Sequence, residues 1–219
     1  MTVSRQPTTR IAATYAVLVP VKPPAVAKSR LGGLGDRART DLARAFAADT
    51  VDAVQACPLV ARVLAVTDDH RLAGRLSEQG VDVIPDGASD LNATLVQAAA
   101  ELHRRDPGLR IVALCADLPA LRPDELTVAL EATDPARMSF VADQERTGTT
   151  VVVAPTLEMF RPSFGPASRR QHLAADAHEV DGVDVPGLRR DVDDPADLAA
   201  ALRLGVGPRT AMVATALRL

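Results

Sequence analysis

The most constraining feature of the sequence is an apolar run, Ile111-Val112-Ala113-Leu114-Cys115-Ala116, that leads directly into a single carboxylate, Asp117. An uninterrupted apolar run bounded by turn residues predicts a strand buried on both faces. Pro119 cannot donate to a sheet ladder and favours extended backbone at Leu118, so strand pairing should stop there. Asp117 should therefore lie just past the carboxyl end of a central strand, where open α/β sheets bind ligands. The alternative is that Asp117 only caps the turn that follows.

This strand belongs to a regular alternation of strands and helices over the first 135 residues. Strands are predicted at residues 15–21, 62–67, 81–85 and from 111, and the helices that follow them begin near Asp36, after Asp69, at Leu91 and near Pro123. Such alternation is typical of an α/β fold with a doubly wound, mostly parallel sheet and helices on both faces. We therefore expect residues 1–13 to form a flexible N-terminal arm and residues 14–219 to form a single domain.

The second half of the chain is less regular and reads as an elaboration of the same sheet. Strands are predicted at 138–142 and 150–154, a loop at 161–168, and a final helix that opens near Pro195, with Asp194 as its N-cap. No internal repeat or low-complexity linker separates the two halves.

Composition excludes several classes of function. The net charge is −3 with acidic and basic residues interspersed, which argues against a nucleic-acid partner held by bulk electrostatics. No stretch approaches the roughly 18 apolar residues that a membrane-spanning helix needs, so no membrane partner is expected. The two cysteines, Cys57 and Cys115, lie in apolar surroundings without metal-ligand spacing, which fits a reduced, cytoplasmic location.

A loop with three cations follows the first predicted strand. Lys22, Lys28 and Arg30 lie within nine residues, and the paired prolines at 23 and 24 exclude a regular helix there. Since this loop should face the ligand crevice of the sheet, its cations would suit a polyphosphate. The loop does not match the lysine-terminated phosphate loop of ATPases or the dinucleotide glycine fingerprint. The alternative is a solvated basic loop.

A set of carboxylates forms the second candidate feature. Asp191 and Asp193 alternate in an extended segment, so their side chains should point the same way. If this segment ends beside Asp117, the three carboxylates would form an oxygen cage for a divalent cation such as Mg²⁺, which binds one or two carboxylates plus substrate phosphates and water. The alternative is that residues 191–194 only cap the helix near Pro195; both can hold, with Asp194 as the cap.

Two small, polar loops, 146–149 and 164–168, form the third candidate feature. Their glycines allow backbone amides to approach an anion, their Thr and Ser hydroxyls add donors, and Ser168 should begin a helix. Each loop alone is more often just a turn. The four histidines show no metal spacing and are expected at the surface, and the chain has no nucleophile elbow.

Taken together, these motifs resemble a known family. Residues 20–31, Asp117-Leu118-Pro119, Thr147-Gly148-Thr149, Phe164-Gly165-Pro166 and Asp191-Val192-Asp193 are similar, in order, to motifs of the guanylyltransferases that build the deazaflavin coenzyme F-420. The similarity spans about 15–207, and the Ala- and Arg-rich composition resembles actinobacterial members, which use phosphoenolpyruvate, more than the archaeal 2-phospho-L-lactate enzymes.

The resemblance implies a fold of the nucleotidyltransferase (glycosyltransferase-A-like) type and a reaction of GTP with phosphoenolpyruvate that gives enolpyruvyl-diphospho-5′-guanosine and pyrophosphate. It implies Mg²⁺ as the cofactor and a set of roles for single residues. Asp117, Asp191 and Asp193 would be metal ligands, Lys22, Lys28 and Arg30 would contact the nucleotide, and Thr149, Gly165 and Ser168 would hold phosphoenolpyruvate. Asp117, Lys28 and Arg30 are the catalytic candidates, and Asn92, at the start of a crevice helix, is a further candidate for nucleotide contact.

Several alternatives stay open at this point. The acceptor could be 2-phospho-L-lactate or 3-phosphoglycerate, the enzyme could be a molybdopterin cytidylyl- or guanylyltransferase, or the chain could be a nucleotide-binding regulator. A homodimer and hand-over of the product to the next enzyme are also compatible with the resemblance. Two departures stand out: the first loop lacks the glycines of the wider nucleotidyltransferase superfamily, and Arg146 occupies a position where Gly is expected.

Overall fold

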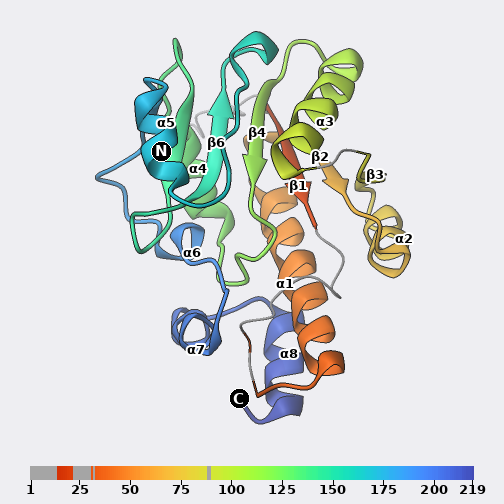
Figure 1. Ribbon diagram of the computed structural model, residues 1–219. Coiled ribbons are helices and arrows are strands. Elements are labelled where there is room, and N and C mark those ends of the chain that lie inside the picture. The colour runs from red at the N-terminus through yellow and green to blue at the C-terminus, as the bar shows by residue number, and fades with distance from the viewer. Residues whose placement is uncertain (1–13, 22–30, 32, 88–89) are drawn as a thin grey trace, which may run out of the picture.

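The computed structural model describes residues 14–21, 31, 33–87 and 90–219, which form one seven-stranded sheet covered by helices (Figure 1). The strands are β1 (Tyr15–Pro20), β2 (Val60–Val66), β3 (Asp82–Ile84), β4 (Arg110–Leu114), β5 (Ser139–Ala142), β6 (Thr149–Ala154) and β7 (His178–Glu179). The helices are α1 (Asp36–Ala56), α2 (His70–Glu78), α3 (Leu91–Arg105), α4 (Pro123–Glu131), α5 (Ser168–Ala174), α6 (Pro186–Arg189), α7 (Pro195–Leu204) and α8 (Pro208–Leu217), with a 3₁₀ turn η1 (Leu157–Met159).

The sheet has the order β3-β2-β1-β4-β6-β5-β7. The first four strands run parallel, β6 runs antiparallel to both of its neighbours, and β7 runs parallel to β5. The sheet is therefore mostly parallel, as predicted, with one reversed strand. That reversal has a consequence for function, because the start of β6 lies at the edge where β4 and β5 end.

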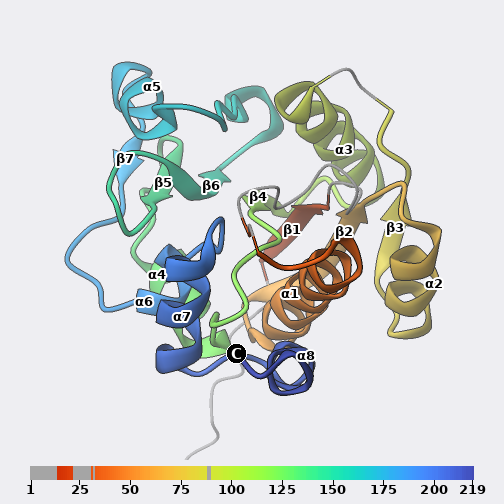
Figure 2. The ribbon, with the colours of Figure 1, turned by 60° about the horizontal axis from the view of Figure 1, so that its bottom comes forward.

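Both faces of the sheet are buried, which explains the continuous apolar strands. One face packs against α1, α2 and α4, and the other packs against α3, with Leu95 and Leu102 of α3 fully covered. Figure 2 shows α3 on the opposite side of the sheet from α1 and α4. Since only four phenylalanines and one tyrosine are available, the core is built mainly from Val, Leu and Ala.

Most predicted elements are confirmed, and the caps explain their boundaries. Asp90 caps α3 by accepting hydrogen bonds from two backbone N–H groups, and Asp194 caps α7 in the same way. Gly80 has φ +79° and ends the turn after α2, as a left-handed cap requires. Asp36 is the first residue of α1 rather than its N-cap, which is Gly35.

Helix α8 was not predicted and follows α7, the helix expected to be the last. Its N-terminus is fixed by Asp49, a buried residue of α1 whose carboxylate accepts the backbone N–H groups of Arg209 at 3.1 Å and Thr210 at 2.7 Å. Pro208 opens the helix, as Pro at a first helical position commonly does. Within the described residues, no helix is long and apolar enough to cross a membrane.

Candidate active site

Asp117 lies just beyond the carboxyl end of β4, as predicted. Its backbone carbonyl accepts the N–H of Val192 at 3.1 Å. Asp191 and Asp193 flank Val192, whose own side chain is fully buried. The structure therefore joins the two acidic segments, although 70 or more residues separate them in the chain. The expected convergence of Asp117 with the 191–193 segment is borne out at the level of the backbone.

The carboxylates at this edge interact electrostatically. The pKa of Asp191 is raised to about 7, first by burial and then by the negative charges of Asp117 and Asp193, with a smaller contribution from Asp143. A like charge nearby disfavours ionisation, and a cation would reverse that effect. We call Asp117, Asp143, Asp191 and Asp193 the carboxylate edge.

The two arginines next to Asp191 are bonded elsewhere. Arg189 donates to the carbonyls of Ala142 at 3.0 Å and Val180 at 2.9 Å, and burial lowers its pKa. Arg190 forms ion pairs with Glu145 at 3.0 Å and Asp197 at 3.1 Å. These two cations therefore fasten the segment before Asp191 to β5 and α7.

The carboxylate edge fits a cation that is only partly coordinated by protein. Among the described residues, no group of three or more His, Cys, Asp or Glu side chains is arranged so that it could hold a metal ion. A closed cage of three carboxylates on one ion, the arrangement expected from the sequence, is therefore not preformed there. Mg²⁺ commonly takes one or two carboxylates and completes its shell with substrate phosphates and water, which an open acidic edge allows.

Asp143, which the sequence analysis did not single out, shapes the loop beside this edge. It follows β5, and its carboxylate accepts the N–H groups of Thr147 at 2.9 Å and Gly148 at 2.7 Å. A Cβ at Gly148 would collide with this carboxylate, so the glycine of the motif is required by close approach. The spacing Asp-x-x-x-Thr-Gly is a local signal that could have identified it.

The backbone conformation of Arg146 explains why a glycine was expected at this position. Its φ is +57°, in the left-handed region that costs most residues about 1 kcal/mol or more. Its guanidinium binds Glu179 at 2.8 Å and Asp181 at 3.1 Å, and Glu179 also holds Arg169 of α5. The arginine therefore keeps the turn that a glycine would allow and ties it to β7.

Thr149 stands at the start of β6, on the same edge of the sheet as Asp117. The N–H of Cys115 bonds to the carbonyl of Thr150 at 2.9 Å, which fixes the two strands in register at this edge. The Thr149 hydroxyl oxygen lies 3.0 Å from Nδ1 of His172 on α5. Thr149 and α5, the helix that Ser168 begins, are thus in direct contact.

Gly165 and Ser168 are the other two residues predicted to hold the acidic substrate. Gly165 lies in the loop before α5, and Ser168 is the first residue of α5. Gly165 has φ +130°, a conformation that favours glycine, and its carbonyl accepts the N–H of Ser168 at 3.1 Å. Asn92, predicted to contact the nucleotide, uses its side-chain amide to bind the backbone of Phe164. The prediction that Asn92 contacts the nucleotide stays untested.

One expectation about the histidines is wrong. His172 was expected at the surface, but its side chain is fully buried and stacked on Phe140, with ring centroids 5.3 Å apart. Burial lowers its pKa to about 4, so the ring is neutral near pH 7. The expectation failed because its partners, Thr149 and Ser163, are brought to it only by the folded sheet.

The cationic loop with Lys22, Lys28 and Arg30 lies outside the described residues, but its two flanks are described. Val21 donates its N–H to the carbonyl of Val66 at 2.8 Å, which extends the pairing of β1. Leu31 is fully buried in the apolar cluster that also contains Val192, between Asp191 and Asp193. Both ends of the loop are thus anchored, one of them in the cluster beneath the carboxylate edge.

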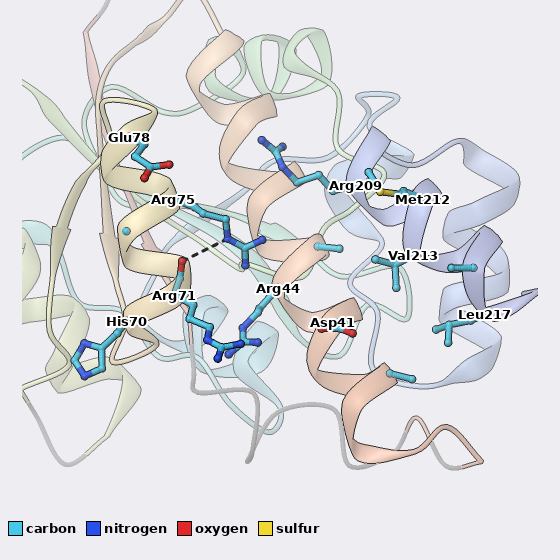
Figure 3. A pocket seen from close by; sticks show the side chains of 14 residues that line it. Asp41, Arg44, His70, Arg71, Arg75, Glu78, Arg209, Met212, Val213 and Leu217 are labelled. Carbon is cyan, nitrogen blue, oxygen red and sulfur yellow. Dashed lines mark hydrogen bonds between the residues drawn. The ribbon is translucent and has the colours of Figure 1, made fainter.

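A separate groove of about 910 Å³ lies between α1, α2 and α8. Arg44, Arg71 and Arg75 point into it, and Met212, Val213 and Leu217 of α8 stand across from them (Figure 3). None of the predicted site residues that the structure describes lines this groove. We call it the arginine groove.

Similar solved structures define the class of fold. A putative nucleotide-diphospho-sugar transferase from Desulfovibrio desulfuricans G20 superposes with a TM-score of 0.67 at 17% identity, covering 91% of this chain and 93% of that one. A 4-diphosphocytidyl-2C-methyl-D-erythritol synthase superposes with a TM-score of 0.60 at 13% identity, covering 88% and 99%. The chain therefore has a nucleotidyltransferase fold.

The family follows from the sequence comparisons. The family model described as guanylyl transferase CofC like matches residues 15–212, and the chain belongs to this family. It is 47% identical over 204 residues to a phosphoenolpyruvate guanylyltransferase of Thermomonospora curvata, covering 92% of this chain and 89% of the relative. It is also 47% identical over 203 residues to the phosphoenolpyruvate guanylyltransferase of Salinispora arenicola, covering 91% and 92%.

Proposed function

We propose that this protein is a phosphoenolpyruvate guanylyltransferase, which joins GTP and phosphoenolpyruvate to give enolpyruvyl-diphospho-5′-guanosine and pyrophosphate in coenzyme F-420 biosynthesis. The single observation that carries the proposal is the carboxylate edge, in which burial and neighbouring negative charges raise the pKa of Asp191 to about 7. Such an edge is suited to a cation-bound polyphosphate. The names of the relatives supply the base and the acceptor.

The reaction needs alignment and charge neutralisation more than a base. A phosphate oxygen of phosphoenolpyruvate, already anionic at neutral pH, attacks the α-phosphorus of GTP in line with the departing pyrophosphate. The barrier is the repulsion between two anions and the entropy of aligning them, both of which a preorganised site lowers. Mg²⁺, when bound, would neutralise phosphate charge and hold the triphosphate in reactive geometry.

Three groups of residues would divide this work. Asp117, Asp191 and Asp193 would hold the cation together with substrate phosphates and water. Lys28 and Arg30 would stabilise the triphosphate and the leaving pyrophosphate, and Lys22 could serve either anion. The donors at Thr149, Gly165 and Ser168 would receive the carboxylate and phosphate of the acceptor; the Ser168 side chain is almost fully buried beside them.

The deciding experiment is a magnesium-dependent assay of pyrophosphate release, run with each of the four nucleotides. Phosphoenolpyruvate, 2-phospho-L-lactate and 3-phosphoglycerate serve as the acceptors. The proposal requires the highest kcat/KM for GTP with phosphoenolpyruvate and loss of turnover on chelation. Preference for CTP would favour a cytidylyltransferase, and nucleotide binding without turnover would favour a regulator.

The same preparation tests the expected partners. We propose a cytoplasmic enzyme that passes its diphosphate product to the next enzyme of the pathway, and a homodimer is compatible with this role. Sedimentation at micromolar concentration measures the oligomeric state. A coupled assay, in which the consuming enzyme is added at increasing concentration, measures hand-over as product that never appears in free solution.

A further inference from the structure

The segment Ser163–Gly165 is held by side chains rather than by a neighbouring strand. The backbone N–H of Phe164 donates to Oδ1 of Asn92 at 2.8 Å, and Nδ2 of Asn92 donates to the Phe164 carbonyl at 3.0 Å. One amide side chain therefore pairs with both polar groups of one residue, as a strand would. Asn92 is itself fixed at the start of α3, where its own N–H bonds to Asp90 at 2.9 Å.

His172 holds the other side of this segment. Its Nε2 accepts the N–H of Ser163 at 3.1 Å, so this nitrogen carries no proton in the neutral ring. The proton then lies on Nδ1, which is 3.0 Å from the Thr149 hydroxyl oxygen. Nδ1 therefore cannot accept a proton from the Thr149 hydroxyl, which keeps its own proton for another acceptor.

The surroundings of His172 keep this arrangement unchanged at neutral pH. Burial lowers the pKa of the ring to about 4, and a hydrogen bond to the Ser168 backbone opposes that shift only in part. The ring stacks on Phe140 and meets the edge of Phe164 at 6.2 Å between centroids. Within the part of the chain that the structure describes, no titratable side chain contributes to this shift, so the imidazole acts as a neutral bridge.

Gly165, the next residue, faces open space. A Cβ at this position would meet no atom of the described residues within 4 Å, and the φ of Gly165 is +130°. Among the described residues, its N–H has no acceptor. A backbone donor in this setting can receive a carboxylate or phosphate oxygen.

We propose that Asn92 and His172 are positioning residues for the phosphorylated acid, because together they set where the Gly165 N–H and the Thr149 hydroxyl stand. The inference rests on the proposed function, in which these two donors receive that acid. It also changes the role expected of Asn92, since its amide serves the acceptor side of the site rather than the guanine nucleotide.

Two sets of variants test the proposal. Asn92→Ala removes both bonds to Phe164, and Asn92→Asp keeps the acceptor while replacing the donor with a second oxygen. Gln97→Ala, at an exposed position of the same helix, is the matched control. His172→Gln keeps a polar group near the place of Nε2, and His172→Asn keeps one near the place of Nδ1.

Steady-state kinetics give the first readout. For Asn92→Ala we expect the KM for the phosphorylated acid to rise about 10- to 100-fold, since small displacements of a positioned group have effects of this size. The KM for GTP should stay within about threefold, because lost positioning at the acceptor side leaves nucleotide binding intact. A larger rise in the KM for GTP than for the acid would overturn the proposal.

Amide hydrogen exchange gives a second readout that needs no turnover. Asn92→Ala should accelerate exchange at Phe164, and His172→Asn should accelerate it at Ser163, whereas His172→Gln should preserve protection there. Unchanged exchange in all variants would overturn the holding role. If the wild-type protein releases no pyrophosphate with any acid, the proposed function fails, and exchange alone then decides whether the two residues hold the segment.

Discussion

The carboxylate edge and the arginine groove are both charged regions, but the neighbours of their charged side chains differ in sign. In the groove, Arg44 is paired with Asp69 at 2.7 Å, and Arg209 is paired with Asp52 and Asp49. At the edge, Asp191 lies among carboxylates that raise its pKa to about 7. Ion pairs such as those of Arg44 and Arg209 mainly serve the fold, whereas negative charges that raise the pKa of a neighbouring carboxyl favour the binding of a cation.

The comparison also shows that size does not identify a site. The groove is roomy, but the two arginines of α2, Arg71 and Arg75, are exposed on the outside of the helix layer. The edge combines strand ends, a buried backbone link between Asp117 and Val192, and loops fixed by close contacts. Ligands of open α/β sheets bind at such strand ends, which favours the edge on physical grounds.

The largest expected effect is a loss of activity on substitution in the carboxylate edge, which substitutions in the arginine groove should not cause. Asp117→Asn should lower kcat/KM for pyrophosphate release by about 10³-fold or more, since a lost cation ligand removes transition-state stabilisation of several kcal/mol. Thermal unfolding should be little changed, because the backbone bond to Val192 is kept. A variant with wild-type turnover would remove Asp117 from the mechanism.

A second prediction concerns the free energy of unfolding without metal. Asp191 has a raised pKa in the folded state, so its ionisation destabilises the fold, and this cost grows as pH rises from about 4 through 7. Asp191→Asn should therefore gain nothing near pH 4 and gain up to about 4 kcal/mol at pH 8, the ceiling set by a shift of about three pKa units.

Urea unfolding of both proteins in chelator, at several pH values, checks this prediction. A gain that is the same at every pH would show that the variant acts through packing and not through charge. Added Mg²⁺ should reduce the gain at pH 8, because the wild-type site has one more carboxylate and should attract the cation more strongly than the variant. The arginine groove offers no comparable gain from removing a charge.

A third prediction concerns His172, whose buried ring is neutral near pH 7. The pKa of His172 is lowered in the folded state, so its contribution to stability is present above about pH 6.5 and is lost as pH falls toward 4. Between pH 7 and 4 the wild-type protein should lose about 3 kcal/mol that His172→Asn does not lose, because that residue cannot be protonated. Chemical unfolding at several pH values measures this difference. If both proteins lose the same free energy of unfolding between pH 7 and 4, the His172 ring is not neutral and buried as assigned.

A fourth prediction tests the groove directly. Arg71→Ala and Arg75→Ala should each leave kcat/KM within about twofold, since neither residue touches the edge and exposed charges contribute little. Stability should change by less than about 0.5 kcal/mol. A loss of turnover as large as that of Asp117→Asn would mean that the groove takes part in catalysis.

How much could be predicted from the sequence depends on how local each signal is. The strand before Asp117 and the Asp194 cap rest on neighbouring residues, and both are confirmed. The links between distant residues were not visible. Asp143 beside Asp191, Asn92 on Phe164 and His172 on Thr149 all depend on strand order and on the reversal of β6. Pattern alone therefore located the edge but not the contacts that fix its loops.

The smallest expected effect concerns Arg146, whose ion pairs stabilise the fold while its left-handed backbone conformation destabilises it. Arg146→Gly should relieve the left-handed strain at φ +57°, worth about 1 kcal/mol, and lose the exposed ion pairs to Glu179 and Asp181, which offsets part of that gain. The free energy of unfolding of Arg146→Gly should therefore stay close to the wild-type value, whereas Arg146→Ala keeps the strain, loses the pairs and should be the less stable variant. Chemical unfolding of the two variants side by side measures the difference. If Arg146→Gly proves clearly less stable than the wild-type protein measured beside it, the ion pairs to Glu179 and Asp181 outweigh the strain, and the turn before Thr149 is held by charge, as Arg44 of the arginine groove is by Asp69.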